Sequence, residues 1–118
     1  MFGRKLESAV NDVGGGQAAI LMGFDGIPVE MYIGESGLDI ETVGMEFSVL
    51  LKEVRKAAEM LEAGSAEEVT VRTDRMSTVL RVINDEYFIA MAVDRAGNIG
   101  KARYLLRLLA PEMRKELS

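Results

Sequence analysis

The side chains that most often carry out chemistry in proteins are missing from this sequence. It contains no histidine and no cysteine, so Ser-His-Asp and Cys-His nucleophile arrangements are excluded. Zinc sites built from thiolate or imidazole ligands are excluded for the same reason. The acidic pair Asp85-Glu86 falls in a predicted turn and Glu67-Glu68 at the start of a predicted strand, and no apolar pocket that could raise a pKa for acid–base work can be inferred at either. We therefore predict no catalytic residue and no enzyme.

One glycine-rich segment could be mistaken for a nucleotide site. Gly97-Asn98-Ile99-Gly100-Lys101 follows a predicted strand and opens a helix, and its lysine follows a glycine as in a P-loop. A P-loop also needs a glycine five positions before Gly100, where this chain has Arg95, and a hydroxyl after the lysine, where it has Ala102. We expect a turn here, with no bound nucleotide and no cofactor.

Charge and composition narrow the partners. The 118 residues fit a single domain, 1–118, and carry 14 basic against 19 acidic side chains, a net charge of -5. Nucleic-acid binding, which depends on clustered Lys and Arg, is disfavoured. No apolar run reaches the roughly 20 residues that a membrane span needs, and Asp25, Asp39 and Asp94 lack the spacing of a calcium loop. We expect no membrane span and no metal, and a cytoplasmic location.

The first third of the chain predicts a helix followed by a hairpin. Apolar residues recur at helical spacing from Phe2 to Val13, and Gly14-Gly15-Gly16 ends that helix. Strands are predicted at 17–24 and 27–34, joined by Asp25-Gly26 as a two-residue type I′ turn. The second of these strands contains a proline, which favours an edge position.

A long helix is predicted from the N-cap Asp39 to Gly64. The residues expected to form its core stripe are Ile40, Val43, Phe47, Leu50, Val54, Ala57 and Leu61. At 100° per residue, Met45, Val49 and Met60 fall on the opposite side, interleaved with Lys52 and Lys56. One flank consists mostly of small residues, which would allow another helix to approach closely: Gly44, Ser48 and Ala58, with Leu51 and Arg55.

Three further strands are predicted at 67–73, 78–84 and 87–93, followed by a helix that Pro111 should break near Ala110. The first and last of the five strands are apolar on both faces and should be central. The resulting α/β fold, an α+β sandwich, has an antiparallel sheet in the order 2-1-5-4-3. The long helix covers one face, and the N- and C-terminal helices cover the other.

The order of elements, the first hairpin 19–29 and the ending 97–105 resemble the roadblock family, the dynein light-chain type domain, across the whole chain. The short chain looks most like the prokaryotic MglB-like members. The resemblance implies a homodimer in which the third strands pair into one continuous sheet and the long helices lie side by side. The interface expected on this basis comprises Val69, Thr70, Val71 and Arg72 with Gly44, Ser48, Leu51, Arg55 and Ala58.

Family members of this type bind a small Ras-like GTPase over the paired long helices and influence its nucleotide cycle. The corresponding docking face would be Met45, Val49, Lys52, Lys56 and Met60. Methionines adapt to a partner's shape, and lysines can meet acidic switch residues. Two other functions stay open: an adaptor subunit of a motor or polarity complex, and a small-ligand sensor.

Overall fold

The computed structural model describes residues 2–118 as three helices and five strands. In chain order these are α1 (Phe2–Asp12), β1 (Gly16–Gly23), β2 (Pro28–Ile33), α2 (Ile40–Met60), β3 (Glu68–Arg72), β4 (Met76–Val82), β5 (Tyr87–Asp94) and α3 (Ile99–Leu117). Every predicted element is present. The ends differ by a few residues from the predicted bounds, as helix and strand ends generally do.

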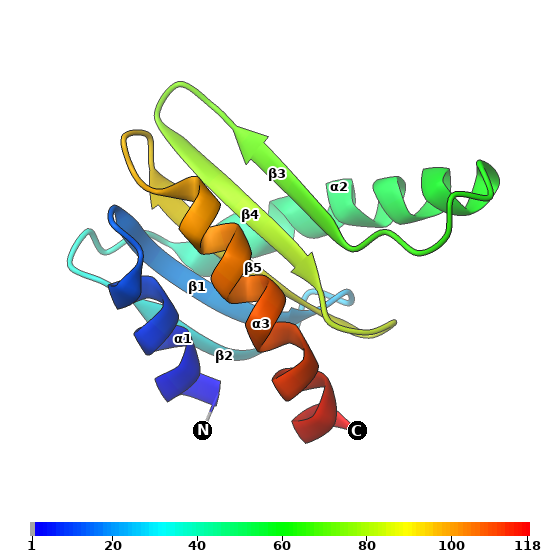
Figure 1. Ribbon diagram of the computed structural model, residues 1–118, viewed down its shortest axis with the longest axis horizontal. Helices are drawn as coiled ribbons and strands as arrows, with labels where there is room; N and C mark the ends of the chain where they lie inside the picture. Colours follow the sequence, from blue (N-terminus) through cyan, green and yellow to red (C-terminus); the bar gives the residue numbers. More distant parts are fainter. Residues whose placement is uncertain (1) are drawn as a thin grey trace.

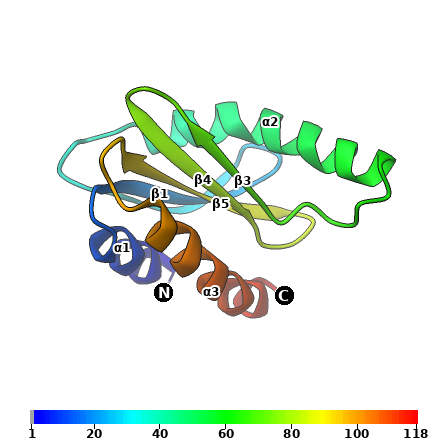
Figure 2. The same ribbon diagram turned by 45° about the horizontal axis from the view of Figure 1, so that its top comes forward.

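The strands form one sheet in the order β2-β1-β5-β4-β3, and every neighbouring pair is antiparallel. Figures 1 and 2 show three layers, with α2 on one face of the sheet and α1 beside α3 on the other. The predicted fold class is confirmed, including the strand order and the distribution of helices. No helix among residues 2–118 is long and apolar enough to cross a membrane.

The two central strands supply both cores because their side chains alternate between the two faces. On β1, Ala19 and Leu21 face α1 and α3, whereas Ile20 and Met22 face α2. The core under α1 and α3 includes Leu106, and all of these side chains are fully buried. Sequence alternation with small and apolar residues on both faces therefore identified the centre of the sheet correctly.

The β1–β2 connection differs from the predicted two-residue turn. Residues 24–27 separate the strands, and the strand register shifts between Leu21 and Met22. A type I′ turn needs positive φ at both central residues, but only Gly26 has one (φ +89°). Asp25 instead accepts a hydrogen bond from the Ile27 amide at 3.0 Å, an Asx turn that widens the loop.

The triple glycine and the loop before α3 meet backbone to backbone. The Gly15 carbonyl accepts from the Asp94 amide at 2.7 Å, and the Gly14 carbonyl accepts from the Asn98 amide at 2.8 Å. Gly15 has φ +83°, and a Cβ there would lie 2.7 Å from the Gly97 Cα. The loop after α1 and the loop before α3 thus join at one end of the sheet, and both form turns as predicted.

The predicted break near Ala110 is wrong. α3 continues from Ile99 to Leu117 with Pro111 inside it. A proline within a helix removes one backbone donor, but Pro111 itself is exposed, while Ala110 and Met113 beside it are buried against the sheet. Packing of these neighbours holds the helical path through the proline.

Candidate interaction surfaces around the long helix

The start of α2 is fixed by its N-cap. Asp39 accepts hydrogen bonds from the Thr42 hydroxyl at 2.7 Å and the Thr42 amide at 3.2 Å. These bonds stabilise the ionised carboxylate and lower the pKa of Asp39 below its usual value. The helix then passes over β1, β2 and β5, and its second half projects past β3 (Figures 1 and 2).

The side of α2 that faces the sheet includes two small residues, Gly44 and Ser48, among larger apolar ones. Gly44, Ser48 and Leu51 are buried there, and a Cβ at Gly44 would lie 3.2 Å from side-chain atoms of Ile20 and Met22. At Gly44 the large side chains come from the sheet, and the absence of a side chain on the helix leaves room for them. The small residues predicted to receive a second helix therefore receive the sheet instead, which removes Gly44, Ser48 and Leu51 from the expected dimer contact.

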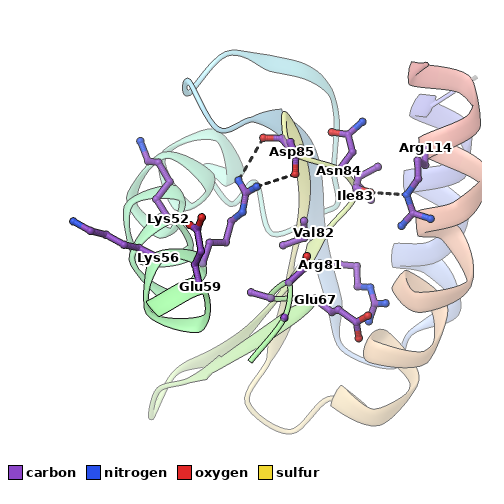
Figure 3. Close-up of a pocket in the computed structure, with 14 residues that line it drawn as sticks. Lys52, Lys56, Glu59, Glu67, Arg81, Val82, Ile83, Asn84, Asp85 and Arg114 are labelled. Atoms are coloured by element: carbon purple, nitrogen blue, oxygen red, sulfur yellow. Dashed lines mark hydrogen bonds and ion pairs between the residues drawn. The ribbon is translucent and has the colours of Figure 1, made fainter. Parts of the chain in front are cut away.

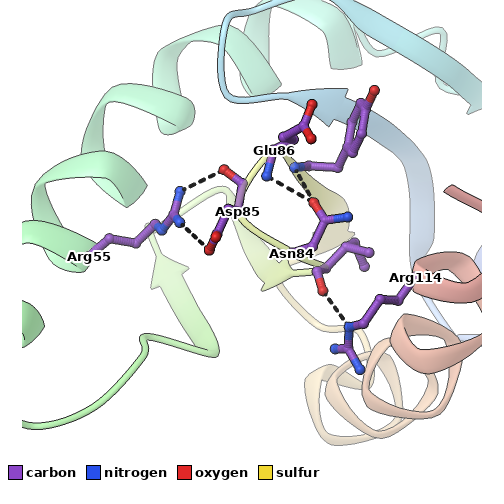
Figure 4. A network of polar contacts seen from close by, with 7 residues as sticks. Arg55, Asn84, Asp85, Glu86 and Arg114 are labelled. Atoms are coloured by element: carbon purple, nitrogen blue, oxygen red, sulfur yellow. Dashed lines mark hydrogen bonds and ion pairs between the residues drawn. The ribbon is translucent and has the colours of Figure 1, made fainter. Parts of the chain in front are cut away.

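Arg55 and Ala58, the other residues of that expected contact, are half-buried. The Arg55 guanidinium lies 4.2 Å from the centre of the Phe24 ring, an example of a cation–π contact. It also reaches the β4–β5 turn, 3.3 Å from the Asp85 carboxylate (Figure 4). Arg55 is thereby held against its own subunit.

The opposite side of α2 carries the five residues predicted as a docking face. Met45 and Val49 are 48% and 57% exposed, Met60 is 78% exposed, and Lys52 and Lys56 are exposed between them. The structure brings all five together on the surface of α2 away from the sheet. Their role in docking stays a prediction.

A second exposed apolar surface was missed by the sequence reasoning. Leu50 and Leu61, which were predicted in the core stripe, are 38% and 78% exposed. Val54 lies between them on the helix and is half-buried. We call Leu50, Val54 and Leu61 the apolar flank. The predicted stripe is confirmed at the start of α2, where Ile40 is buried and Val43 and Phe47 pack against the same core. It is wrong from Leu50 onward, where Leu51 is buried instead and Leu50 and Leu61 are exposed.

β3 is an edge strand, paired on one side with β4 only. Of the four residues expected to join a symmetry mate, Thr70 and Arg72 are exposed, and Val69 and Val71 are half-buried. On the face of the sheet that α2 covers, Met76 and Val82 of β4 are also only partly buried. The predicted edge position of β3 is confirmed, and the paired role of its residues stays a prediction.

Known protein structures resemble this chain over nearly its full length. MglC from Myxococcus xanthus has 41% sequence identity, covers 98% of both chains and gives a TM-score of 0.71. A Roadblock/LC7 domain from Streptomyces avermitilis has 19% identity and a TM-score of 0.85, covering 98% of this chain and 96% of that one. MglB in a tetrameric arrangement has 14% identity and a TM-score of 0.83, covering 95% and 84%. No protein-family model and no curated protein matches the sequence.

The fold is therefore that of a roadblock/LC7 domain. The chain belongs to the roadblock/LC7 family and is similar to MglC from end to end. The expected likeness to MglB is confirmed for the fold, while the greater sequence similarity is to MglC. Among residues 2–118, no group of three or more acidic side chains could hold a metal ion.

Proposed function

We propose that this chain is a self-associating regulator or scaffold of a small Ras-like GTPase, which it binds through the outward side of α2 without an active site of its own. The observation that carries the proposal is the docking face of Met45, Val49, Lys52, Lys56 and Met60, which lies uncovered on a helix otherwise anchored to the sheet. The family and the 41% identity to MglC support the assignment.

The chemistry of this face suits a protein partner. Flexible methionine side chains fit several partner shapes at modest cost, and Lys52 and Lys56 offer positive charge to acidic residues of a GTPase. Exposed apolar groups interleaved with charge on one helix are typical of a docking surface. Reshaping of the bound GTPase, rather than an inserted catalytic arginine, would then change its hydrolysis rate.

Self-association would use two other uncovered features. The free backbone groups of β3, from Val69 to Arg72, suit pairing with a symmetry mate. The apolar flank would supply the helix contact in place of Gly44, Ser48 and Leu51. MglB in a tetrameric arrangement is a precedent for self-association on this fold. The two α2 helices would then present their docking faces side by side.

The test is capture of GTPases from the source cell extract on the immobilised chain, with GTP or GDP added, followed by a hydrolysis assay on any GTPase recovered. The variants Met45→Glu and Val49→Glu should lose at least tenfold in affinity, because each introduces a charge at the centre of the docking face. Leu108→Glu is the matched control, since Leu108 on α3 is 51% exposed on the opposite layer.

Recovery of a GTPase that the Met45 and Val49 variants bind as well as the unmodified chain would overturn the docking face. Recovery of no GTPase in either nucleotide state would overturn the regulator function and leave the adaptor function. A GTPase that binds without any change in hydrolysis or exchange would restrict the chain to a scaffold.

A further inference from the structure

A cleft of about 560 Å³ opens between the two helical layers at the end of the sheet where β4 turns into β5. Its walls come from the second half of α2, the segment 64–67 before β3, the end of β4 with its turn, and Arg114 of α3 (Figure 3). Its volume lies within the range of about 300–1,000 Å³ usual for ligand clefts.

The lining of the cleft carries more basic than acidic side chains, although the protein as a whole is acidic. Its lining includes five basic and three acidic side chains: Lys52, Arg55, Lys56, Arg81 and Arg114 against Glu59, Glu67 and Asp85. The chain as a whole has a net charge of -5. Like charges kept together in one cleft repel one another, so their gathering here favours an anionic group bound between them.

Most of these cations form no ion pair among residues 2–118. Arg55 is paired with Asp85, and the remaining ion pairs among residues 2–118 join Lys5 to Glu112 and Glu116, and Arg103 to Glu68. Lys52, Lys56, Arg81 and Arg114 therefore form no ion pair in the described part of the chain. Arg114 is oriented by a 2.7 Å hydrogen bond from its Nε to the Ile83 carbonyl, and its Nη groups are left for other contacts (Figure 4).

Arg81 is the most informative of the four. Its Nε is buried without a hydrogen-bond partner, one of two such side-chain atoms among residues 2–118. Its neighbour across the ladder, Glu68, is bound instead to Arg103 at 2.8 Å. Burying an N–H donor without a hydrogen-bond partner is costly, and a carboxylate bound at the Nη end of the same guanidinium would offset part of this cost. Arg81 is thus positioned to bind an anion.

We propose that this cleft binds an acidic polypeptide segment of a partner protein, with a carboxylate seated between Arg81 and Arg114. Guanidinium groups bind carboxylates with two parallel hydrogen bonds, which gives geometric selectivity. Lys52 and Lys56, which also belong to the docking face, attract the segment at the α2 rim of the cleft. The site goes beyond the proposed function, because Arg81 and Arg114 lie outside that face.

A polypeptide fits the cleft better than a phosphate group does. Glu59 and Glu67 also line it and form no ion pair among residues 2–118. A peptide brings backbone N–H donors for these carboxylates together with its own acidic side chain. A phosphomonoester dianion has no donor for these carboxylates, and either it or inorganic phosphate would be repelled by both glutamates. Apolar atoms of Ala66 and Val82 in the lining suit the neighbouring side chains of a peptide.

The test uses the ¹⁵N-labelled chain and the peptide acetyl-Glu-Leu-Glu-Leu-Glu-amide, followed by NMR at the arginine Nε–H signals and the backbone amides of 82–85. The signals of Arg81 and Arg114 should shift with this peptide but not with its glutamine counterpart. Arg81→Gln or Arg114→Gln should weaken binding at least tenfold. Arg107→Gln removes the same charge from an exposed site on α3 outside the cleft and should change affinity less than twofold.

Arg114→Gln removes a hydrogen bond to Ile83, so Lys56→Gln, on an exposed side chain, serves as a second variant that leaves the fold intact. Equal shifts with inorganic phosphate would overturn the polypeptide assignment. Equal binding of the glutamine peptide, equal weakening by Arg107→Gln, or no shifts at all would overturn the site. Met45→Glu should bind the peptide normally, so failure here and failure of the GTPase docking face are separable.

Discussion

The two faces of the sheet are covered to different extents. On one face, α1 and α3 lie side by side over a core in which Leu6, Leu21, Ile89 and Leu106 are fully buried. On the other, α2 lies alone over β1, β2 and β5 and projects past the edge. Its apolar flank and docking face are left in solvent. Both faces hold a buried core, and on the second face α2 also carries the apolar flank and the docking face that we propose for association.

This difference explains why the same kind of residue should have different effects on the two faces. A leucine under α3 is surrounded by other side chains, so its removal leaves a cavity. A leucine on the α2 flank has few neighbours within the chain, so its removal costs little until a partner covers it. Mutations that separate stability from association can therefore be chosen between the buried core under α3 and the exposed flank of α2.

The largest effect on stability is expected on the face of the sheet that α1 and α3 cover. Leu106→Ala should lower the free energy of unfolding by about 2–5 kcal/mol, because it removes a fully buried side chain from the core under α3. Leu61→Ala, at a position 78% exposed, should change the monomer's stability by less than about 0.5 kcal/mol. Urea unfolding measures both. Similar losses for the two variants would remove the distinction between the faces.

A smaller loss of stability is expected where the loop after α1 contacts the loop before α3. A Cβ at Gly97 would lie 2.5 Å from the Val93 Cγ1 atom and 2.6 Å from the Gly14 carbonyl oxygen. Gly97→Ala should therefore force the two loops apart and cost about 1–3 kcal/mol, as overpacking does. Gly14→Ala is the control, because a Cβ there meets nothing within 4 Å. Thermal unfolding that treats both variants alike would contradict the close contact.

The smallest effect concerns the N-cap of α2 and depends on pH. The folded-state pKa of Asp39 is lowered by its bonds to Thr42, so its stabilisation is present above the unfolded pKa near 3.8 and is lost as pH falls through the folded value. Asp39→Asn keeps a capping side chain but does not titrate. Urea unfolding of this variant should be less sensitive to acid than that of the unmodified chain. Equal sensitivity would show that Asp39 is not a linked group.

The sequence predicted the fold well because the signals were local and consistent. Alternation in β1 and β5 marked the central strands, and Pro28 marked an edge. The core side of α2 was predicted correctly for Ile40, Val43 and Phe47 but wrongly from Leu50 onward. No helix pattern reveals that Gly44 lies against the sheet, because the bulk at that contact belongs to Ile20 and Met22. The cleft escaped prediction because Arg81 and Arg114 come together only through the packing of α3.

The central claim is that the α2 side of this chain is an association surface, and sedimentation equilibrium tests it most directly. The unmodified chain should show twice its 12.9 kDa mass. The double variant Leu50→Lys/Leu61→Lys should show the monomer mass with unchanged secondary structure, and Leu108→Lys should remain a dimer. A monomer mass for the unmodified chain at every concentration, or a double variant that still dimerises, would contradict the account.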